Sequence, residues 1–162
     1  MQMGRWKLFE RCDIADYADP GDVYLKRWNL LTTPWFGIKI HHIRRPDADR
    51  VLHTHPWGFV TFILRGGYVE EMGPQHKIVH RRPGSVARHP SDHRHRIAEL
   101  RGRQTWTFVL TGPKVPNEFE PGENRWGFWV DDDTWVYWKD YLYGGGRVAV
   151  HLPTAQDADT VA

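Results

Sequence analysis

Two histidines separated by one residue, His53 and His55, are the first residues of the sequence that could do chemistry. They end a predicted strand, and side chains two residues apart on a strand point to the same face of its sheet. Two imidazoles on one face can occupy two adjacent positions around a metal ion. A third ligand must come from elsewhere, and the histidine-rich segment 88–95 offers candidates. The spaced pair alone is a weak signal, because the chain contains ten histidines.

Most of the remaining histidines have structural explanations. Consecutive residues of a strand point to opposite faces, so one of the pair His41-His42 is expected to point inward and the other outward. We expect His89 in packing or in a loop, because Pro90 follows it. The others are expected at the surface, and these are His76, His80 and His151.

The elements that must position these residues are short strands. Apolar residues occur in short β-branched and aromatic runs that are broken by Gly, Pro, Asn and Asp, a pattern typical of all-β proteins. No long amphipathic helix is predicted. This many short strands with frequent turns predicts a β-sandwich, a jelly roll or a small barrel. The predicted strands are 36–43, 49–55, 59–64, 67–71, 76–80, 86–89, 95–99, 104–110, 125–130 and 135–139.

Two segments toward the ends of the chain differ from that series. The segment 6–25 has no clear pattern, and within it 13–22 is expected to form a loop or a short helix. Near the other end, four of the nine tryptophans fall between 126 and 138. Residues 131–134 predict a turn, and the aromatic residues on either side predict the cross-strand pairs of a hairpin. We favour this structural role over stacking on a substrate.

Composition limits the class of protein. A length of 162 residues predicts one domain. Hydrophobic residues make up 40% of the chain, which argues against disorder, and a net charge of +2 argues against a nucleic-acid partner. The one cysteine, Cys12, cannot form an internal disulfide, which favours a reducing cytoplasm. Since no apolar run approaches the ~20 residues that span a bilayer, we expect no membrane partner.

Two stretches of the sequence resemble the motifs of the cupin family. The run 53–66, His-Thr-His-Pro-Trp-Gly-Phe-Val-Thr-Phe-Ile-Leu-Arg-Gly, is similar to the first motif, in which two histidines, a glutamate and a glycine follow at fixed spacing. The run 83–97 is similar to the second motif, and His95 falls on its metal-ligand histidine. The resemblance implies a double-stranded β-helix, the cupin jelly-roll barrel, with a metal site of His53, His55 and His95. More narrowly, the chain is similar to uncharacterised cupin-like proteins of actinobacteria and their phages.

The resemblance also implies how the chain is divided. The cupin domain is expected over residues 28–152, and residues 1–27 are expected to form an N-terminal extension that packs on the barrel. The polar segment 153–162 is expected to be a frayed tail. A homodimer would be ordinary for this family, and we expect one.

The sequence departs from the family pattern at the glutamate, where it has Phe59. Glu70 and Glu71 lie beyond a Gly-Gly turn and would need a different strand geometry to reach the metal. The predicted ligand set is therefore three histidines, with His93 as a reserve ligand. Three neutral imidazoles leave the full 2+ charge on the ion, which favours an anionic co-ligand. By resemblance, such sites hold iron in thiol-dioxygenase-type cupins and zinc in hydratase-like sites, so we expect Fe(II), with Zn, Mn or Ni as alternatives.

Residues near the motifs are candidates for a pocket around the metal. Water would be excluded from this pocket by the aromatic residues Trp57, Phe59 and Phe62, and Thr61 would lie among them. An arginine could pair with an anionic substrate, and Arg88 is placed in the pocket, although surface exposure is the default for it. Arg65 and Arg96 are considered for the same role. The candidates for orienting a histidine or taking part in catalysis are Tyr68, Asp92 and His93.

Three functions remain open at this point. The favoured one is a small-molecule enzyme of the non-haem iron dioxygenase type, acting on a substrate that can be anionic. The second is a metal-free isomerase or epimerase of sugar nucleotides, which would need an arginine cluster for a diphosphate. The third is a non-catalytic binding or structural protein, in which the hairpin of residues 126–138 would be an exposed surface for assembly.

Overall fold

The computed structural model of this chain describes residues 6–15, 21–47, 51–118 and 120–143, and these residues form two antiparallel sheets. The first sheet contains, in spatial order, β1 (Lys7–Ala15), β2 (Val23–Thr32), β3 (Gly37–Ile43), β10 (Thr105–Lys114), β5 (Trp57–Arg65) and β8 (Val86–His89). The second contains β12 (Trp135–Tyr137), β11 (Gly127–Trp129), β4 (Leu52–His53), β9 (His95–Leu100), β6 (Tyr68–Met72) and β7 (Lys77–Arg81). The helix α1 (Trp138–Tyr143) follows β12.

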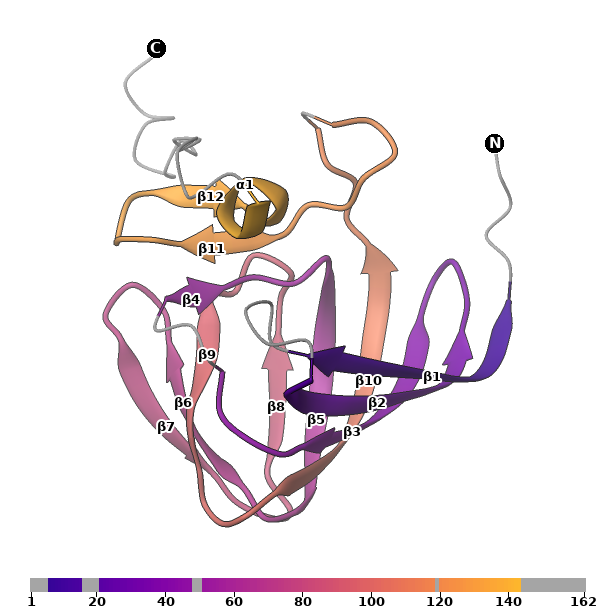
Figure 1. The fold of residues 1–162 in the computed structure, drawn as a ribbon, viewed down its shortest axis with the longest axis vertical. Coiled ribbons are helices and arrows are strands. Elements are labelled where there is room, and N and C mark those ends of the chain that lie inside the picture. Colours follow the sequence, from indigo (N-terminus) through magenta and orange to yellow (C-terminus); the bar gives the residue numbers. More distant parts are fainter. Residues whose placement is uncertain (1–5, 16–20, 48–50, 119, 144–162) are drawn as a thin grey trace.

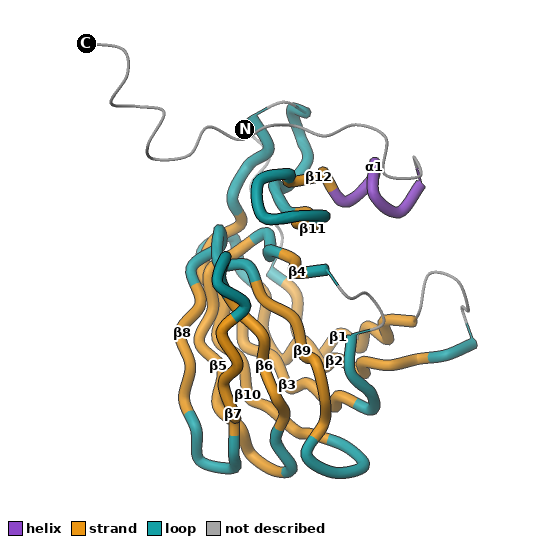
Figure 2. The backbone as a smooth tube through the Cα atoms, turned by 90° about the vertical axis from the view of Figure 1, so that its left-hand side faces the viewer, coloured by secondary structure: helices purple, strands orange, loops and turns teal. Residues whose placement is uncertain are grey.

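The two sheets face each other and form a barrel. Figure 1 shows strands β3 to β10 curving around a common interior, and Figure 2 shows the same arrangement from the side. In both views the β11–β12 hairpin and α1 lie over one end of the barrel, next to β4. The all-β jelly-roll barrel predicted from the sequence is confirmed. Among the described residues, no helix is long and apolar enough to cross a bilayer.

Each predicted strand overlaps an observed one, and the strand at 86–89 has the predicted bounds. The largest error is the N-terminal segment 6–25, because it contributes to two long strands, β1, which pairs with β2, and β2, which also pairs with β3. Residues 16–20 of the loop or helix expected over 13–22 lie outside the described residues. Most of β1 is exposed and carries charged residues at an open sheet edge. The inward–outward alternation that reveals a strand is therefore missing there.

Other differences lie at the ends of elements or outside the described residues. Of the strand predicted over 49–55, residues 49 and 50 lie outside the described residues and β4 covers Leu52–His53. The strand predicted to run to residue 139 ends at Tyr137, and α1 begins at Trp138. The hairpin around residues 131–134 is confirmed, with Trp129 opposite Trp135. The predicted tail at 153–162 and His151 lie outside the described residues.

One buried hydroxyl connects the two sheets at the turn between β5 and β6. Thr105 is fully buried, and its Oγ1 atom donates to the carbonyl of Gly67 at 2.7 Å and accepts from the Gly67 amide at 3.0 Å. Gly66 and Gly67 have φ angles of 84° and 125°, which favour glycine. Two residues along the same strand, Thr107 is also buried, but its hydroxyl has no hydrogen-bond partner in the described part of the chain.

These two threonines give a matched test of the fold. We expect Thr105→Val to lower the free energy of unfolding by about 2–4 kcal/mol, because it leaves a buried backbone amide and a buried carbonyl without their partner. Thr107→Val removes a hydroxyl that bonds to nothing, so we expect no loss of stability. Urea denaturation of both variants measures the difference, and equal losses would contradict it.

Candidate metal centre

The three histidines predicted as metal ligands meet at one point between the sheets. His53 ends β4 and His95 begins β9, and because they are register partners in an antiparallel pair, their side chains share a face. His55 lies in the link from β4 to β5. One ligand nitrogen of each histidine lies within 4.8 Å of the other two.

The donor set suits a divalent metal ion. Two imidazole nitrogens that each lie about 2.0–2.1 Å from one ion are about 3 Å from each other. The Nε2 atoms of His55 and His95 are 2.9 Å apart. Burial lowers the pKa of His95 to about 4 and that of His55 well below its ordinary value. Both imidazoles are therefore neutral at pH 7, the state in which histidine binds a metal.

A buried carboxylate fixes the orientation of His95. Glu70, in β6, is completely buried, and its Oε1 atom accepts hydrogen bonds from His95 Nδ1 at 2.6 Å and from His89 Nε2 at 2.7 Å. Its Oε2 atom accepts from Arg81 Nε at 2.7 Å. Burial alone raises the pKa of Glu70, but the hydrogen bonds from His89 and His95 outweigh burial and hold that pKa well below its ordinary value. Since the ionised carboxylate only accepts, His95 carries its proton on Nδ1 and presents a bare Nε2.

A shift in strand register brings Glu70 and His95 to the same interior. Tyr68 pairs with Leu100, but after the shift Glu70 pairs with Ile97. Without it, the even-numbered residues of β9 would continue to face inward and His95 would face away from Glu70. The spacing of residues in the sequence does not predict this shift. Glu70 therefore lies behind a predicted ligand as its hydrogen-bond partner, which is a role that sequence reasoning missed.

Phe59 occupies the wall where the family pattern has a glutamate. Its ring stacks on His89 at 4.6 Å and meets His55 edge-on at 5.0 Å. Phe59 and His89 are register partners in β5 and β8, which accounts for the stacking. The aromatic ring covers the triad on this side with an apolar surface and offers no ligand atom.

A second cluster lies behind the triad and contains Glu70, His89 and His93. The ring of His93, predicted as a reserve ligand or catalytic residue, lies 5.7 Å from that of His95 and 4.8 Å from that of His89. His89 Nδ1 and His93 Nε2 are buried and have no hydrogen-bond partner among the described residues. The structure therefore places His93 beside the Glu70 network and outside the triad. Asp92, its neighbour, is exposed.

A cavity of about 690 Å³ opens from the triad into the barrel. Of the predicted pocket residues, Trp57, Phe59 and Thr61 line it, and so does the candidate Tyr68. Burial raises the pKa of Tyr68, so its phenol stays neutral and can donate a hydrogen bond but cannot act as a base near pH 7. The lining is otherwise largely apolar.

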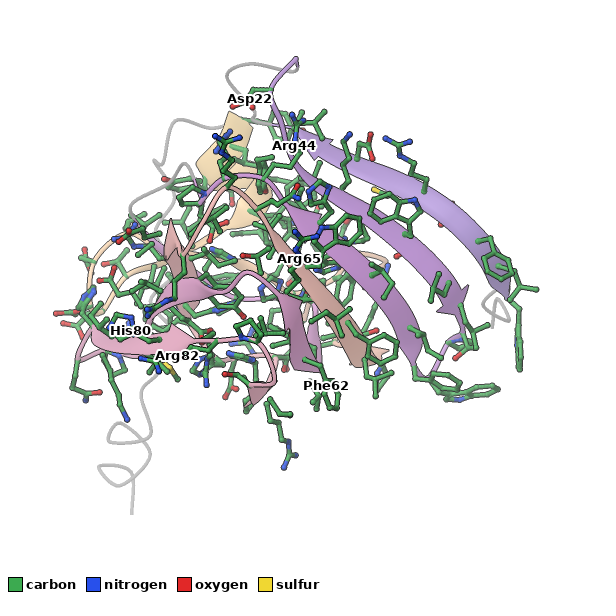
Figure 3. All side chains as sticks on the ribbon, turned by 90° about the horizontal axis from the view of Figure 1, so that it is seen from below. Asp22, Arg44, Phe62, Arg65, His80 and Arg82 are labelled. Atoms are coloured by element: carbon green, nitrogen blue, oxygen red, sulfur yellow. The ribbon has the colours of Figure 1, made fainter. Side chains whose placement is uncertain are left out.

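The prediction that Arg88 belongs to the pocket is wrong, because this residue does not line the cavity. Strand β8 alternates, and since Ala87 and His89 are buried, Arg88 between them is exposed. The other considered residues also lie outside. Figure 3 shows Phe62 on the outside of the barrel, and 38% of the residue is exposed. Arg65 is exposed, and Arg96 forms an ion pair with Glu71 at 2.6 Å.

Two charged residues do line the cavity, Arg27 in β2 and Asp47, whose carboxylate accepts from the Ile97 amide at 2.7 Å. The Nε atom of Arg27 donates to His41 Nε2 at 3.0 Å, and His41 lines the cavity as well. His42 instead stacks on Trp106 at 4.3 Å on the other face, so the prediction of one inward and one outward histidine is confirmed. Sequence reasoning missed Arg27 because it did not recognise β2. The apolar residue two positions earlier, Leu25, was the available signal.

The β11–β12 hairpin and α1 close the cavity from above. Trp126, Phe128 and Tyr141 line it, and the Phe128 ring stacks on that of Tyr141 at 4.0 Å. Trp135 and Tyr137 are buried, with 3% and 7% of their surface exposed. The hairpin is therefore packed as part of the cavity wall. The reading in which it forms a free surface for assembly loses its main support.

Comparisons with known proteins give the fold. No family model matches the sequence, and no curated protein matches it either. Among solved structures, a candidate mannose-6-phosphate isomerase from Ralstonia eutropha has a TM-score of 0.52 and 18% identity, over 57% of this chain and 88% of that one. The Fe(II) form of HppE has a TM-score of 0.52 and 16% identity, over 63% of this chain and 56% of that one. A cupin superfamily protein from Desulfitobacterium hafniense has a TM-score of 0.47 and 14% identity, over 56% of this chain and 78% of that one.

The pKa of His95 predicts how the metal-free protein responds to acid. The pKa of a histidine in an unfolded chain is about 6.5, whereas burial lowers the pKa of native His95 to about 4. Between these two pKa values the unfolded chain binds a proton that the native chain does not. The contribution of His95 to the free energy of unfolding is therefore fully present above the upper pKa and is lost as the pH falls toward the lower one. We expect His95 alone to lower the free energy of unfolding by about 1 kcal/mol between pH 6.5 and 5.5.

Urea denaturation in the presence of a chelator measures this loss. His80→Gln removes an exposed histidine outside the site and is measured alongside as the matched control. A free energy of unfolding that is constant over this pH range would contradict the prediction.

Proposed function

The chain has the cupin fold, and on that premise we propose that it is a small-molecule enzyme of the non-haem iron dioxygenase type that binds Fe(II) through His53, His55 and His95. The observation that carries the proposal is a set of three imidazoles around one point. The hydrogen bond from His95 Nδ1 to Glu70 leaves the Nε2 atom of His95 free to bind a metal at that point. HppE, which shares this fold, is known in an Fe(II) form. Iron is therefore the first metal to test, ahead of Zn, Mn and Ni.

The metal and the protein have separate tasks in this proposal. When bound, Fe(II) supplies redox chemistry toward O₂ at the coordination positions that three histidines leave open. Phe59 and Trp57 exclude water from that side of the cavity. Glu70 holds His95 in place and keeps its Nδ1 proton away from the metal side. The neutral hydroxyl of Tyr68 can orient a bound molecule.

The lining of the cavity favours this proposal over a sugar-nucleotide isomerase. A diphosphate carries several negative charges and is held by more than one cationic group. In the part of the chain that the structure describes, Arg27 is the one arginine that lines the cavity. The remaining wall is mainly apolar, which suits a smaller and less charged substrate.

Metal content tests the proposal directly. Elemental mass spectrometry on protein purified without a nickel column should give close to one iron per chain. The variant His53→Ala/His95→Ala should lose it, and the matched control His76→Ala/His80→Ala, which removes two exposed histidines, should keep it. Iron-dependent O₂ consumption with a panel of thiols and carboxylic acids then tests the reaction.

Two outcomes would change the conclusion. Stoichiometric zinc or manganese at the same histidines would retain the site and replace oxygenation with hydrolysis or isomerisation. Failure of the folded wild-type protein to bind any divalent metal would contradict the three-histidine site.

The role of Glu70 gives a further prediction. Glu70→Gln keeps the size of the side chain but removes the charge that orients His95, so we expect metal affinity to fall by about 10- to 100-fold. The neighbouring Glu71 pairs with His76 and Arg96 and does not contact the triad. Glu71→Gln is therefore the control and should bind metal like the wild type. Titration against a competing chelator measures both, and equal affinities would show that Glu70 does not act on the ligand.

A further inference from the structure

We propose that the wall of the first sheet holds the carboxylate of a substrate with an apolar body, through Arg27 and Thr107, while the rest of that molecule extends toward the triad. This inference names the substrate class of the cavity described above and rests on the proposed function. Strand register places three polar residues of the first sheet side by side. Arg27 in β2 pairs with His41 in β3, and His41 pairs with Thr107 in β10. Directly paired residues share a face, and all three line the cavity.

This polar row faces the triad across the cavity. His53 and His95 belong to the second sheet, whereas Arg27, His41 and Thr107 belong to the first. Arg27 and all three histidines line the same cavity. A molecule held at Arg27 would therefore have its other end near the three histidines.

Arg27 lacks a partner of opposite charge. Its Nε atom donates to His41 Nε2 at 3.0 Å, and His41 thereby fixes the plane of the guanidinium. No ion pair joins Arg27 to a carboxylate among the described residues, and its terminal N–H groups have no acceptor there. A guanidinium withdrawn from water without an anion is costly, and its two parallel donors match the two oxygens of a carboxylate.

Thr107 supplies a second, independent indication. Its side chain is 1% exposed, and its Oγ1 atom has no hydrogen-bond partner. Buried hydroxyls are normally paired, so an unpaired one in a cavity wall next to His41 marks a place where a ligand atom would be satisfied. The carboxylate of a substrate would supply that acceptor.

The rest of the wall defines the body of the substrate. Leu25, Ile43, Val109 and Phe128 surround the polar row with apolar surface. Sugars and nucleotides carry hydroxyl groups that would find few partners there. A cavity of about 690 Å³ accommodates an aryl or alkyl chain attached to the acid. The chemical class is therefore a monocarboxylic acid with an aromatic or aliphatic body.

Calorimetric binding of benzoate, 3-phenylpropanoate and octanoate to the full chain tests the inference. We expect Arg27→Gln to weaken binding of the acids that bind the wild type by about 10- to 100-fold, because charge-assisted hydrogen bonds are lost. Arg88→Gln removes an exposed arginine and should have no effect. The amide 3-phenylpropanamide should bind weakly to the wild type and be insensitive to Arg27→Gln.

Thr107→Val provides the second variant, in case Arg27→Gln does not fold. It should weaken acid binding by about 3- to 10-fold while leaving the melting temperature at or above that of the wild type. A merely structural role for Thr107 would not produce this combination. Failure of all three acids to bind the wild type at millimolar concentration, or binding that is unaffected by both variants, would overturn the inference. Tighter, Arg27-dependent binding of phenyl phosphate than of the acids would overturn the carboxylate assignment.

The same measurements separate this inference from the proposed function. Acid binding is repeated on chelator-treated protein and on His53→Ala/His95→Ala. If the wild type binds no metal but acid binding still depends on Arg27, the carboxylate site stands and the oxygenase fails. If metal binds at the histidines and acid binding ignores Arg27, the metal site stands and the carboxylate site fails.

Discussion

The geometry of the candidate site depends on one buried negative charge. Withdrawing a carboxylate from water costs several kcal/mol unless donors surround it, and Glu70 has three, from Arg81, His89 and His95. These donors belong to β7, β8 and β9, and Glu70 belongs to β6. The interaction thus joins four consecutive strands across both sheets. It also decides which nitrogen of His95 is available to a metal, so the stability of the barrel and the chemistry of the site share one interaction.

The two sheets contribute different chemistry to the cavity between them. The second sheet supplies imidazole nitrogens and the first supplies a positive charge at Arg27, with apolar side chains separating them. In the proposed function, a divalent ion at one wall and the guanidinium at the other would together attract a molecule that carries negative charge. Phe59, at the position where the cupin motif has a glutamate, would increase this attraction because it places no negative charge beside the ion.

The sequence was informative where a local rule determines the outcome. Alternation along a strand placed one residue of the pair His41-His42 inward, and this is observed for His41. His53 and His55 also meet, although only His53 lies in a strand. Arg88 was misplaced because spacing within one strand does not say which face is the inner one. The role of Glu70 was missed because its contact with His95 depends on the register of β6 against β9. Arg27 was missed because β2 lies beside a highly charged edge strand, where alternation gives no clear pattern.

The separation of the triad along the chain has a consequence for how a metal would enter the protein. His95 follows His55 by 40 positions in the sequence. A chain that is still being synthesised exposes His53 and His55 well before β9 leaves the ribosome, and it then offers two loosely held ligands. The third ligand arrives only when β9 pairs with β4 and β6. On the proposed function, the choice among the metals of the cell would therefore be made by the folded barrel after synthesis rather than by the nascent chain.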